Sequence, residues 1–286
     1  MTNADDPLAA LLKPERLIDV VDVGANPHGG YSPPYKTLLA KRLCRVIGFE
    51  PQAEALRNLD KAKGPNETYL PYALGDGETH TLHVCVADGM TSLFEPDPST
   101  LELFPEFPEW GRVVKRDRIR TVRLDEVSEI ETIDWLKIDI QAGELSALQN
   151  GRSKLAHVVA IHTEVSFVPL YRNQPPFGAI DLELRSLGLL PHAFTDINRR
   201  TVAPLRSSNP YDHINQMVEA DIVYVRDFRD MSALSVDQLT NLALICHHSY
   251  SSFDIAARCV AELQRRNRLP ADALQRYGAI MRSHRP

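Results

Sequence analysis

The sequence predicts an α/β protein built on a doubly wound, mostly parallel sheet of seven strands. Three observations predict it: short apolar runs alternate with helical patterns, the first run ends in a glycine turn, and the second ends in an acidic residue. Strands that alternate with helices form right-handed βαβ units, whose parallel sheet binds ligands at the carboxyl ends of its strands. At 286 residues the chain is long enough for one large domain of this kind.

The first half of the chain contains three strands and then an interruption. Pro51 opens a segment of good helix formers, which is typical of a helix start. We predict strands at Leu17–Val23, Arg45–Glu50 and Thr68–Leu74, and helices at Tyr35–Leu43 and Gln52–Ala62. Residues 76–125 are turn-rich, alternating and partly proline-rich, so we expect an inserted β segment and a loop near the site.

The second half resumes the alternation and then becomes helical. We predict strands at Asp134–Ile140, His157–Phe167, Leu190–Thr195 and Ala220–Phe228, and helices at Glu144–Gln149 and Ile180–Leu187. After Asp230, apolar residues fall on one helical face in three successive segments, which predicts a small helical extension. It could cap the site, pair subunits into a homo-oligomer, or pack on the sheet. We therefore expect a domain at residues 1–230 and an extension at residues 231–286.

Composition and charge disfavour several classes of function. The net charge of −6 gives no broad positive field for a phosphate backbone, so we do not expect a nucleic-acid partner. The first residues lack a basic start and a long apolar run, and no later run is long enough to cross a bilayer. The four cysteines are scattered without paired spacing, which is typical of reduced thiols in a cytoplasmic protein.

The loop that contains Asp22, Gly24 and Asn26 follows the first strand, where a parallel sheet binds ligands. Gly24 lets the backbone approach a ligand closely. A pyrophosphate ligand would favour GxGxxG, whereas here only one glycine precedes Pro27. The acid at the start suits a cofactor with a positively charged amino-acid end, such as S-adenosylmethionine. The alternative is a tight turn that binds nothing.

Two further acids follow the next strands. Glu50 ends the second strand, where a carboxylate can accept hydrogen bonds from both hydroxyls of an adenosyl ribose, in NAD or in S-adenosylmethionine. Asp76 lies between Gly75 and Gly77 after the third strand, where it either meets an adenine edge or serves as a turn residue.

Eight segments occur in an order that matches one known family. In sequence they are DVGANPHGGYSPPYKTLLA, GFEPQAEAL, YALGDGE, MTSLFEP, TVRLDEV, WLKIDIQAGELSALQNG, HTEVSFVPLYRNQPPF and ADIVYVRDF, over roughly residues 17–228. In them the chain resembles the FkbM-type methyltransferases. The resemblance implies a class I, Rossmann-like fold and methyl transfer from S-adenosylmethionine, usually to an oxygen of a sugar, polyketide or similar metabolite, with Glu50 holding the ribose. One position departs, because Ala142 stands where the family usually has glycine.

The predicted catalytic residues are Asp139, His162 and Glu164. Asp139 ends the fourth strand, where a side chain meets the transferred methyl group, and it also counts among the cofactor-binding residues. His162 and Glu164 are two apart on the fifth strand and therefore share a face. An alcohol must lose its proton or bind a metal, so we expect either His162 as the base or Mg²⁺ held by Asp139 and Glu164. The alternative for His162 is a hydrogen-bonded core histidine.

Five loop residues are predicted to contact the acceptor: Tyr31, Tyr35, Tyr171, Arg172 and Gln174. Aromatic and amide groups suit a polyhydroxylated molecule, although each residue could equally pack within its own loop. The leading hypothesis is an O-methyltransferase that acts on a hydroxyl of a sugar, glycan or polyketide-like metabolite. A nicotinamide-dependent oxidoreductase and a catalytically silent cofactor-binding module are the alternatives.

Overall fold

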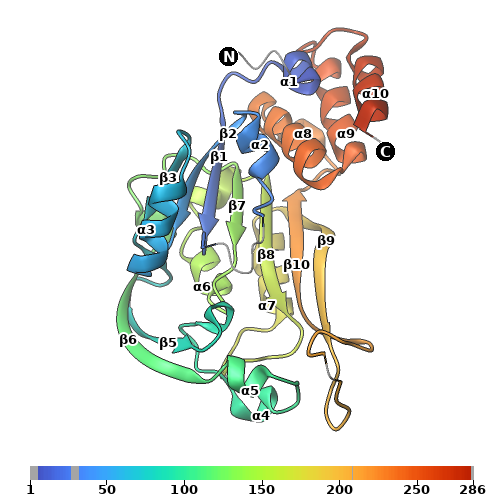
Figure 1. Cartoon of the computed structure of the whole chain (residues 1–286). Helices are drawn as coiled ribbons and strands as arrows, with labels where there is room; N and C mark the ends of the chain where they lie inside the picture. The colour runs from blue at the N-terminus through green and yellow to red at the C-terminus, as the bar shows by residue number, and fades with distance from the viewer. Residues whose placement is uncertain (1–5, 27–31, 208, 285–286) are drawn as a thin grey trace.

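A computed structural model describes residues 6–26, 32–207 and 209–284 (Figure 1). Its centre is a seven-stranded sheet of order β3-β2-β1-β7-β8-β10-β9. The first five strands in this order pair in parallel, and β10 runs antiparallel to both of its neighbours. The bounds are β1 (Ile18–Val23), β2 (Cys44–Phe49), β3 (Glu67–Leu70), β7 (Trp135–Ile138), β8 (Ala160–Ser166), β9 (Leu189–Arg200) and β10 (Gln216–Arg226). The predicted doubly wound, mostly parallel sheet is confirmed.

Two apolar cores cover the two faces of this sheet. Side chains alternate along β7, so Trp135 belongs to one core while Leu136 and Ile138 belong to the other. The Trp135 core includes α1 (Pro7–Leu12), α2 (Lys36–Ala40), α8 (Val236–Tyr250), α9 (Phe253–Arg265) and α10 (Ala273–His284). The opposite core includes α6 (Glu144–Gln149) and α7 (Phe177–Ser186), and α3 (Ala53–Ala62) lies beside β3 (Figure 1). Burial on both faces explains why the predicted strands are almost continuously apolar.

The inserted segment forms a second sheet of order β4-β6-β5, from β4 (Ala73–Leu74), β5 (Thr79–Cys85) and β6 (Val113–Val122), together with α4 (Pro98–Leu101) and α5 (Phe107–Trp110). The inserted β segment is therefore confirmed. The predicted strand Thr68–Leu74 is wrong as one element, because it is divided between the two sheets. Pro71 has no N–H group to donate to a ladder, so β3 ends just before it.

Two predicted boundaries also differ from the structure. The helix predicted at Tyr35–Leu43 is limited to α2, because Arg42 has φ +56°, a left-handed conformation that ends a helix. The hairpin of β9 and β10 is longer than predicted at its turn end, where β9 reaches Arg200 and β10 begins at Gln216. The strands β9 and β10 continue to pair where their side chains are polar, so the apolar pattern used for the prediction ends before the hydrogen bonding does.

Three helices follow β10, as predicted. A capping box of Ser235 and Gln238 starts α8, and its buried residues pack against the sheet in the Trp135 core. Figure 1 shows these helices in orange and red, at the end of the sheet opposite α4 and α5. Packing on the sheet is thus observed, whereas subunit pairing and the division at residue 230 stay predictions. In the described part of the chain, no helix has the length and apolar character that a membrane span needs.

Candidate active site

The carboxyl ends of three neighbouring strands, β2, β1 and β7, bring several of the predicted cofactor-binding residues together. Asp22 lies near the end of β1, Glu50 follows β2 and Asp139 follows β7. Gly24 has φ +80°, and a Cβ atom added there would lie 2.0 Å from the carbonyl oxygen of Asp139. Only glycine fits, because the loop after β1 and the end of β7 touch backbone to backbone.

The smaller of two cavities near these residues has a volume of about 100 Å³ and lies at the carboxyl ends of β1 and β2. Its lining is partly apolar and includes Gly24, Glu50, Tyr72, Leu74, Leu82, Asp88, Ser92 and Asp139. Glu50 is only 4% exposed, and its Oε1 accepts the backbone N–H of Gln52 at 2.7 Å. Burial raises the pKa of Glu50. The buried carboxylate can accept hydrogen bonds from a hydroxylated ring, and the apolar part of the cavity can pack against a flat ring joined to it.

Asp76 lies outside the lining of this cavity. Its Oδ1 contacts Nε2 of His80 at 2.8 Å and accepts the backbone N–H of Glu78 at 2.9 Å. The His80 contact lowers the pKa of Asp76 to about 2. These are the contacts of a turn residue, which was the alternative to an adenine-binding role.

A larger cavity of about 730 Å³ opens on the Trp135 face of the sheet. Gly24 and Asp139 line both cavities. The larger cavity is rich in acids and tyrosines, and its lining includes Asp22, Asn26, Tyr35, Tyr69, Lys137, His162, Asp196, Asn198, Tyr211 and Asp221. The structure therefore brings Asp22, Asn26, Tyr35, Asp139 and His162 to one cavity.

Asp22 is already paired within the protein. Its Oδ2 accepts the hydroxyl proton of Tyr35 at 2.6 Å, and its Oδ1 lies 3.3 Å from Nζ of Lys137. Lys137 also donates to the carbonyl oxygen of Gly24 at 3.0 Å. Burial alone would disfavour the ammonium group, but the carboxylates of Asp22 and Asp139 raise the pKa of Lys137, so it stays charged. The pair fixes the loop after β1 against β7.

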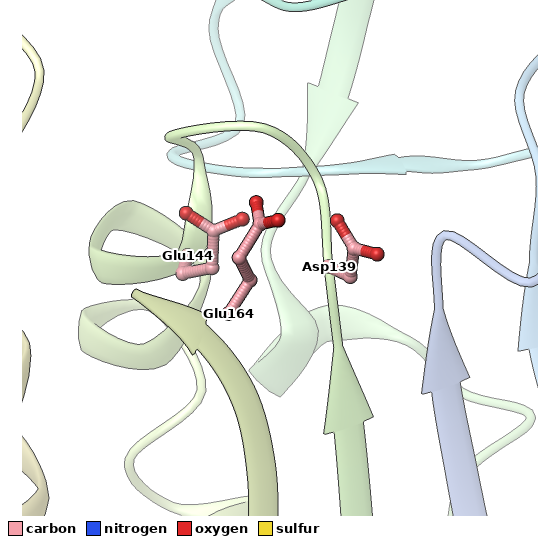
Figure 2. Close-up of side chains that lie close together, drawn as sticks. All are labelled: Asp139, Glu144 and Glu164. Carbon is pink, nitrogen blue, oxygen red and sulfur yellow. The ribbon is translucent and has the colours of Figure 1, made fainter. Parts of the chain in front are cut away.

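Three carboxylates converge where β7, β8 and α6 meet. Asp139, Glu144 and Glu164 each have an oxygen within 4.8 Å of the others, and Figure 2 shows Glu164 between the other two. Glu144 accepts the backbone N–H of Ile140 at 2.8 Å, and burial raises its pKa to about 7. Burial and the charge of Asp139 raise the pKa of Glu164 well above its usual value. Such raised pKa values cluster at functional sites.

Gln141 links two of these acids and was not predicted. Its Nε2 lies 3.0 Å from Oδ1 of Asp139 and 3.0 Å from Oε2 of Glu164. Its Oε1 accepts the hydroxyl proton of Tyr171 at 3.0 Å. The amide therefore relieves the repulsion between two carboxylates that would otherwise face each other.

The turn after β7 has two successive left-handed residues. Gln141 has φ +53° and Ala142 has φ +79°. Ala142 stands where the resemblance led us to expect glycine, and its backbone conformation is one that glycine adopts more easily. The chain thus keeps the backbone of the turn without the residue that favours it.

The residues predicted to contact the acceptor are dispersed. Tyr31 lies outside the described residues, and Tyr35 lines the larger cavity. Tyr171 is buried beneath Gln141. Arg172 pairs with Glu95 at 3.2 Å, and Gln174 holds its own loop by accepting the backbone N–H of Leu170 at 2.7 Å. Neither Arg172 nor Gln174 lines either cavity, which agrees with the loop-packing alternative.

Several lining residues were missed by the sequence reasoning. Lys137 had a usable signal, because it lies two residues before Asp139 in the predicted strand Asp134–Ile140 and would share its face there. Asp196 and Asp221 had no such signal in the sequence. They line the cavity because β9 pairs with β10, which places the two residues opposite each other.

Solved structures with some likeness to this chain have low similarity scores. The magnesium protoporphyrin IX methyltransferase of Synechocystis PCC 6803, crystallised with bound SAM, is 12% identical, with 77% of this chain and 76% of that chain covered and a TM-score of 0.37. The precorrin-6y C5,15-methyltransferase of Geobacter metallireducens GS-15 is 12% identical, with 77% and 86% covered and a TM-score of 0.36. Neither likeness bears on the activity of this chain. Comparison with curated proteins gave no significant match.

The seven-stranded sheet with its one reversed strand, and the crevice at the ends of β1, β2 and β7, define a class I methyltransferase fold. The model of the methyltransferase FkbM domain matches residues 22–190, and the chain belongs to this family. It is therefore an S-adenosylmethionine-dependent methyltransferase.

Proposed function

We propose that this chain transfers a methyl group from S-adenosylmethionine to a hydroxyl group of a sugar, glycan or polyketide-like metabolite. The observation that carries the proposal is the position of Asp139, which lines both cavities. The smaller cavity suits the adenosine of the cofactor. The larger cavity suits the acceptor, and Asp139 contributes to the lining of both cavities.

The smaller cavity fits an adenosyl group on two grounds. Among the described residues, only the Gln52 N–H is hydrogen-bonded to the Glu50 carboxylate, which leaves its other oxygen available for ribose hydroxyls. Leu74 and Leu82 offer apolar surface for a flat ring. When bound, S-adenosylmethionine supplies an electrophilic methyl carbon on a positively charged sulfur, and carboxylates near that charge favour its binding.

The larger cavity suits a molecule with many hydroxyl groups. Asp196 and Asp221 offer oxygens that accept hydrogen bonds from hydroxyl groups, and Asn198 can both donate and accept. Tyr69 and Tyr211 add aromatic surface against which the apolar face of a sugar ring can pack. The carboxylates would repel a phosphorylated or carboxylated acceptor near the reacting hydroxyl.

Proton removal from the acceptor is assigned to His162. The imidazole is 3% exposed and lines the larger cavity together with Asp139. A neutral imidazole nitrogen can take the proton that the hydroxyl group loses as its oxygen attacks. Asp221, whose Oδ1 lies 3.8 Å from Nε2, then stabilises the positive charge that remains on the imidazole.

The proposal is tested by incubating the protein with methyl-labelled S-adenosylmethionine and a cell extract. Mass spectrometry of the labelled product identifies the acceptor and the methylated atom. Label on an oxygen of a hydroxylated metabolite is expected, whereas label on nitrogen or carbon would contradict O-methyl transfer. Complete absence of labelled product would favour the catalytically silent module. S-adenosylhomocysteine should raise the melting temperature and NADH should not, which separates this activity from the nicotinamide-dependent alternative.

Replacing Glu50 by alanine is expected to remove most of the stabilisation by S-adenosylhomocysteine. Hydrogen bonds to a charged group are worth about 1.5–3 kcal/mol each, so losing two weakens binding at least about 100-fold. At a ligand concentration of about 100 Kd, the stabilisation then falls from about 2.7 to about 0.4 kcal/mol. The thermal shift measures this loss. The control is Glu54→Ala, which removes an exposed carboxylate from the nearby α3. An unaltered shift in Glu50→Ala would remove Glu50 from the ribose site.

Magnesium is the second candidate for acceptor activation, because Asp139, Glu144 and Glu164 converge. In the structure, however, the Gln141 amide bridges Asp139 and Glu164, and it would have to move before an ion could bind there. We therefore expect EDTA to leave the transfer rate unchanged within about twofold, as for a base-catalysed reaction. The assay uses the acceptor found by labelling. Loss of activity with EDTA and its recovery with MgCl₂ would instead establish the metal-dependent route.

A further inference from the structure

His162 is held by the C-terminal helix α8. The hydroxyl oxygen of Tyr250, the last residue of α8, lies 3.1 Å from Nδ1 of His162. The two rings lie side by side, with centroids 6.0 Å apart and an angle of 34° between their planes. A helix outside the region that matches the family model therefore contacts a residue that lines the acceptor cavity.

Among the described residues, none makes a comparable contact with the opposite nitrogen of His162. Its Nε2 lies 3.8 Å from Oδ1 of Asp221, which is too long for a hydrogen bond. Because a neutral imidazole has one protonated nitrogen and one free nitrogen, the partner of Nδ1 decides what Nε2 can do. If Nδ1–H donates to the Tyr250 oxygen, Nε2 keeps its lone pair and can accept a proton.

The Tyr250 ring is itself held in place. The edge of Trp135 packs against it, with centroids 5.6 Å apart and planes at 72°. Trp135 packs in the same way against Tyr35, at 6.2 Å and 85°. Tyr35 in turn donates its hydroxyl proton to Asp22 at 2.6 Å. A row of three aromatic rings thus connects Asp22 to His162, so the Tyr250 hydroxyl has little freedom to move.

We propose that Tyr250 is a positioning residue of the acceptor site, which accepts a hydrogen bond from Nδ1–H of His162 and leaves Nε2 free to take the proton of the acceptor. The proposal rests on the proposed function, in which His162 is the base. It gives the helical extension a part in the reaction besides its packing on the sheet.

The state of His162 can be measured without the acceptor. In protein labelled with ¹⁵N-histidine, long-range proton–nitrogen spectra show which ring nitrogen carries the proton, and the His162→Gln variant assigns the signal. We expect the Nδ1–H form in the unaltered protein and a shift toward the Nε2–H form in Tyr250→Phe. With the acceptor found by labelling, Tyr250→Phe should lower kcat on the order of 10–100-fold and leave KM nearly unchanged.

Tyr277→Phe is the matched control. The Tyr277 hydroxyl on α10 lies 3.2 Å from Nδ1 of His247, a buried histidine on α8. The variant therefore removes a tyrosine hydroxyl that contacts a histidine, as Tyr250→Phe does, but at a place that does not line the cavity. Its melting temperature should fall about as much as that of Tyr250→Phe, with the His162 signal and kcat unchanged. An Nε2–H form of His162 in the unaltered protein, or a signal that Tyr250→Phe leaves unmoved, would overturn the proposal while O-methyl transfer stands. Full turnover in His162→Gln would overturn the base itself, and the role of Tyr250 with it.

Discussion

Asp139→Asn is expected to slow methyl transfer at least about 100-fold, the range for losing a group that acts only in the transition state. Asparagine keeps the size of the side chain and an oxygen for the Gln141 amide, which lies 3.0 Å away in the structure. What it loses is the negative charge of a side chain that lines both cavities. Binding of S-adenosylhomocysteine, which lacks the sulfonium charge, should change little.

The rate is measured with the acceptor found by labelling, and binding is measured by calorimetry. Asp60→Asn is the control, because Asp60 is exposed on α3 and pairs with Lys63 at 2.9 Å. Its rate should match that of the unaltered protein. If Asp139→Asn turns over at a near-normal rate, Asp139 does not belong to the reacting centre.

Removing residues 231–286 is expected to abolish cooperative folding. The truncation uncovers the Trp135 face of the sheet, where α8 alone contributes Leu239, Leu242, Leu244 and Ile245 to the core. At about 1.5–3 kcal/mol for each buried side chain, these four contribute about 6–12 kcal/mol. The net stability of a whole domain is only about 5–15 kcal/mol. Soluble yield and a thermal melt followed by circular dichroism measure the loss.

Two single substitutions test the same point in the full chain. Leu242→Ala, at a fully buried position, should cost about 2–5 kcal/mol. Leu274→Ala, at a position on α10 that is 43% exposed, should change stability by less than about 0.5 kcal/mol. A truncated chain that melts cooperatively would show that residues 1–230 fold alone, and that the extension is a separate unit.

The fold could be predicted from the sequence because its elements are locally encoded. Strands buried on both faces are almost continuously apolar, and Pro51 and the residues after it favour a helix. The end of β3 was missed because an apolar run continues through Pro71, and only the missing N–H group stops the pairing. The length of the hairpin of β9 and β10 was underestimated, because the polar parts of these strands lack the apolar pattern that predicts a strand.

The site was predictable where one strand end was enough to place a residue. Glu50 and Asp139 line the cavities because the carboxyl ends of neighbouring parallel strands lie side by side, and His162 lines the larger cavity from within β8. The roles of Gln141 and Tyr250 could not be predicted, because they depend on contacts with Glu164 and His162, which lie 23 and 88 residues away in the sequence. Contacts of that kind depend on how helices and turns pack, which no local pattern encodes.

The close approach of Gly24 to Asp139 joins two segments that both line the two cavities. The Val23 carbonyl oxygen accepts the Asp139 N–H at 3.0 Å, so the same two segments are also joined by a main-chain hydrogen bond. No side chain lies between them to take up a displacement. A displacement of the loop after β1 would therefore also move the backbone of Asp139, so we expect a ligand bound in the smaller cavity to affect the position of Asp139 in the larger one.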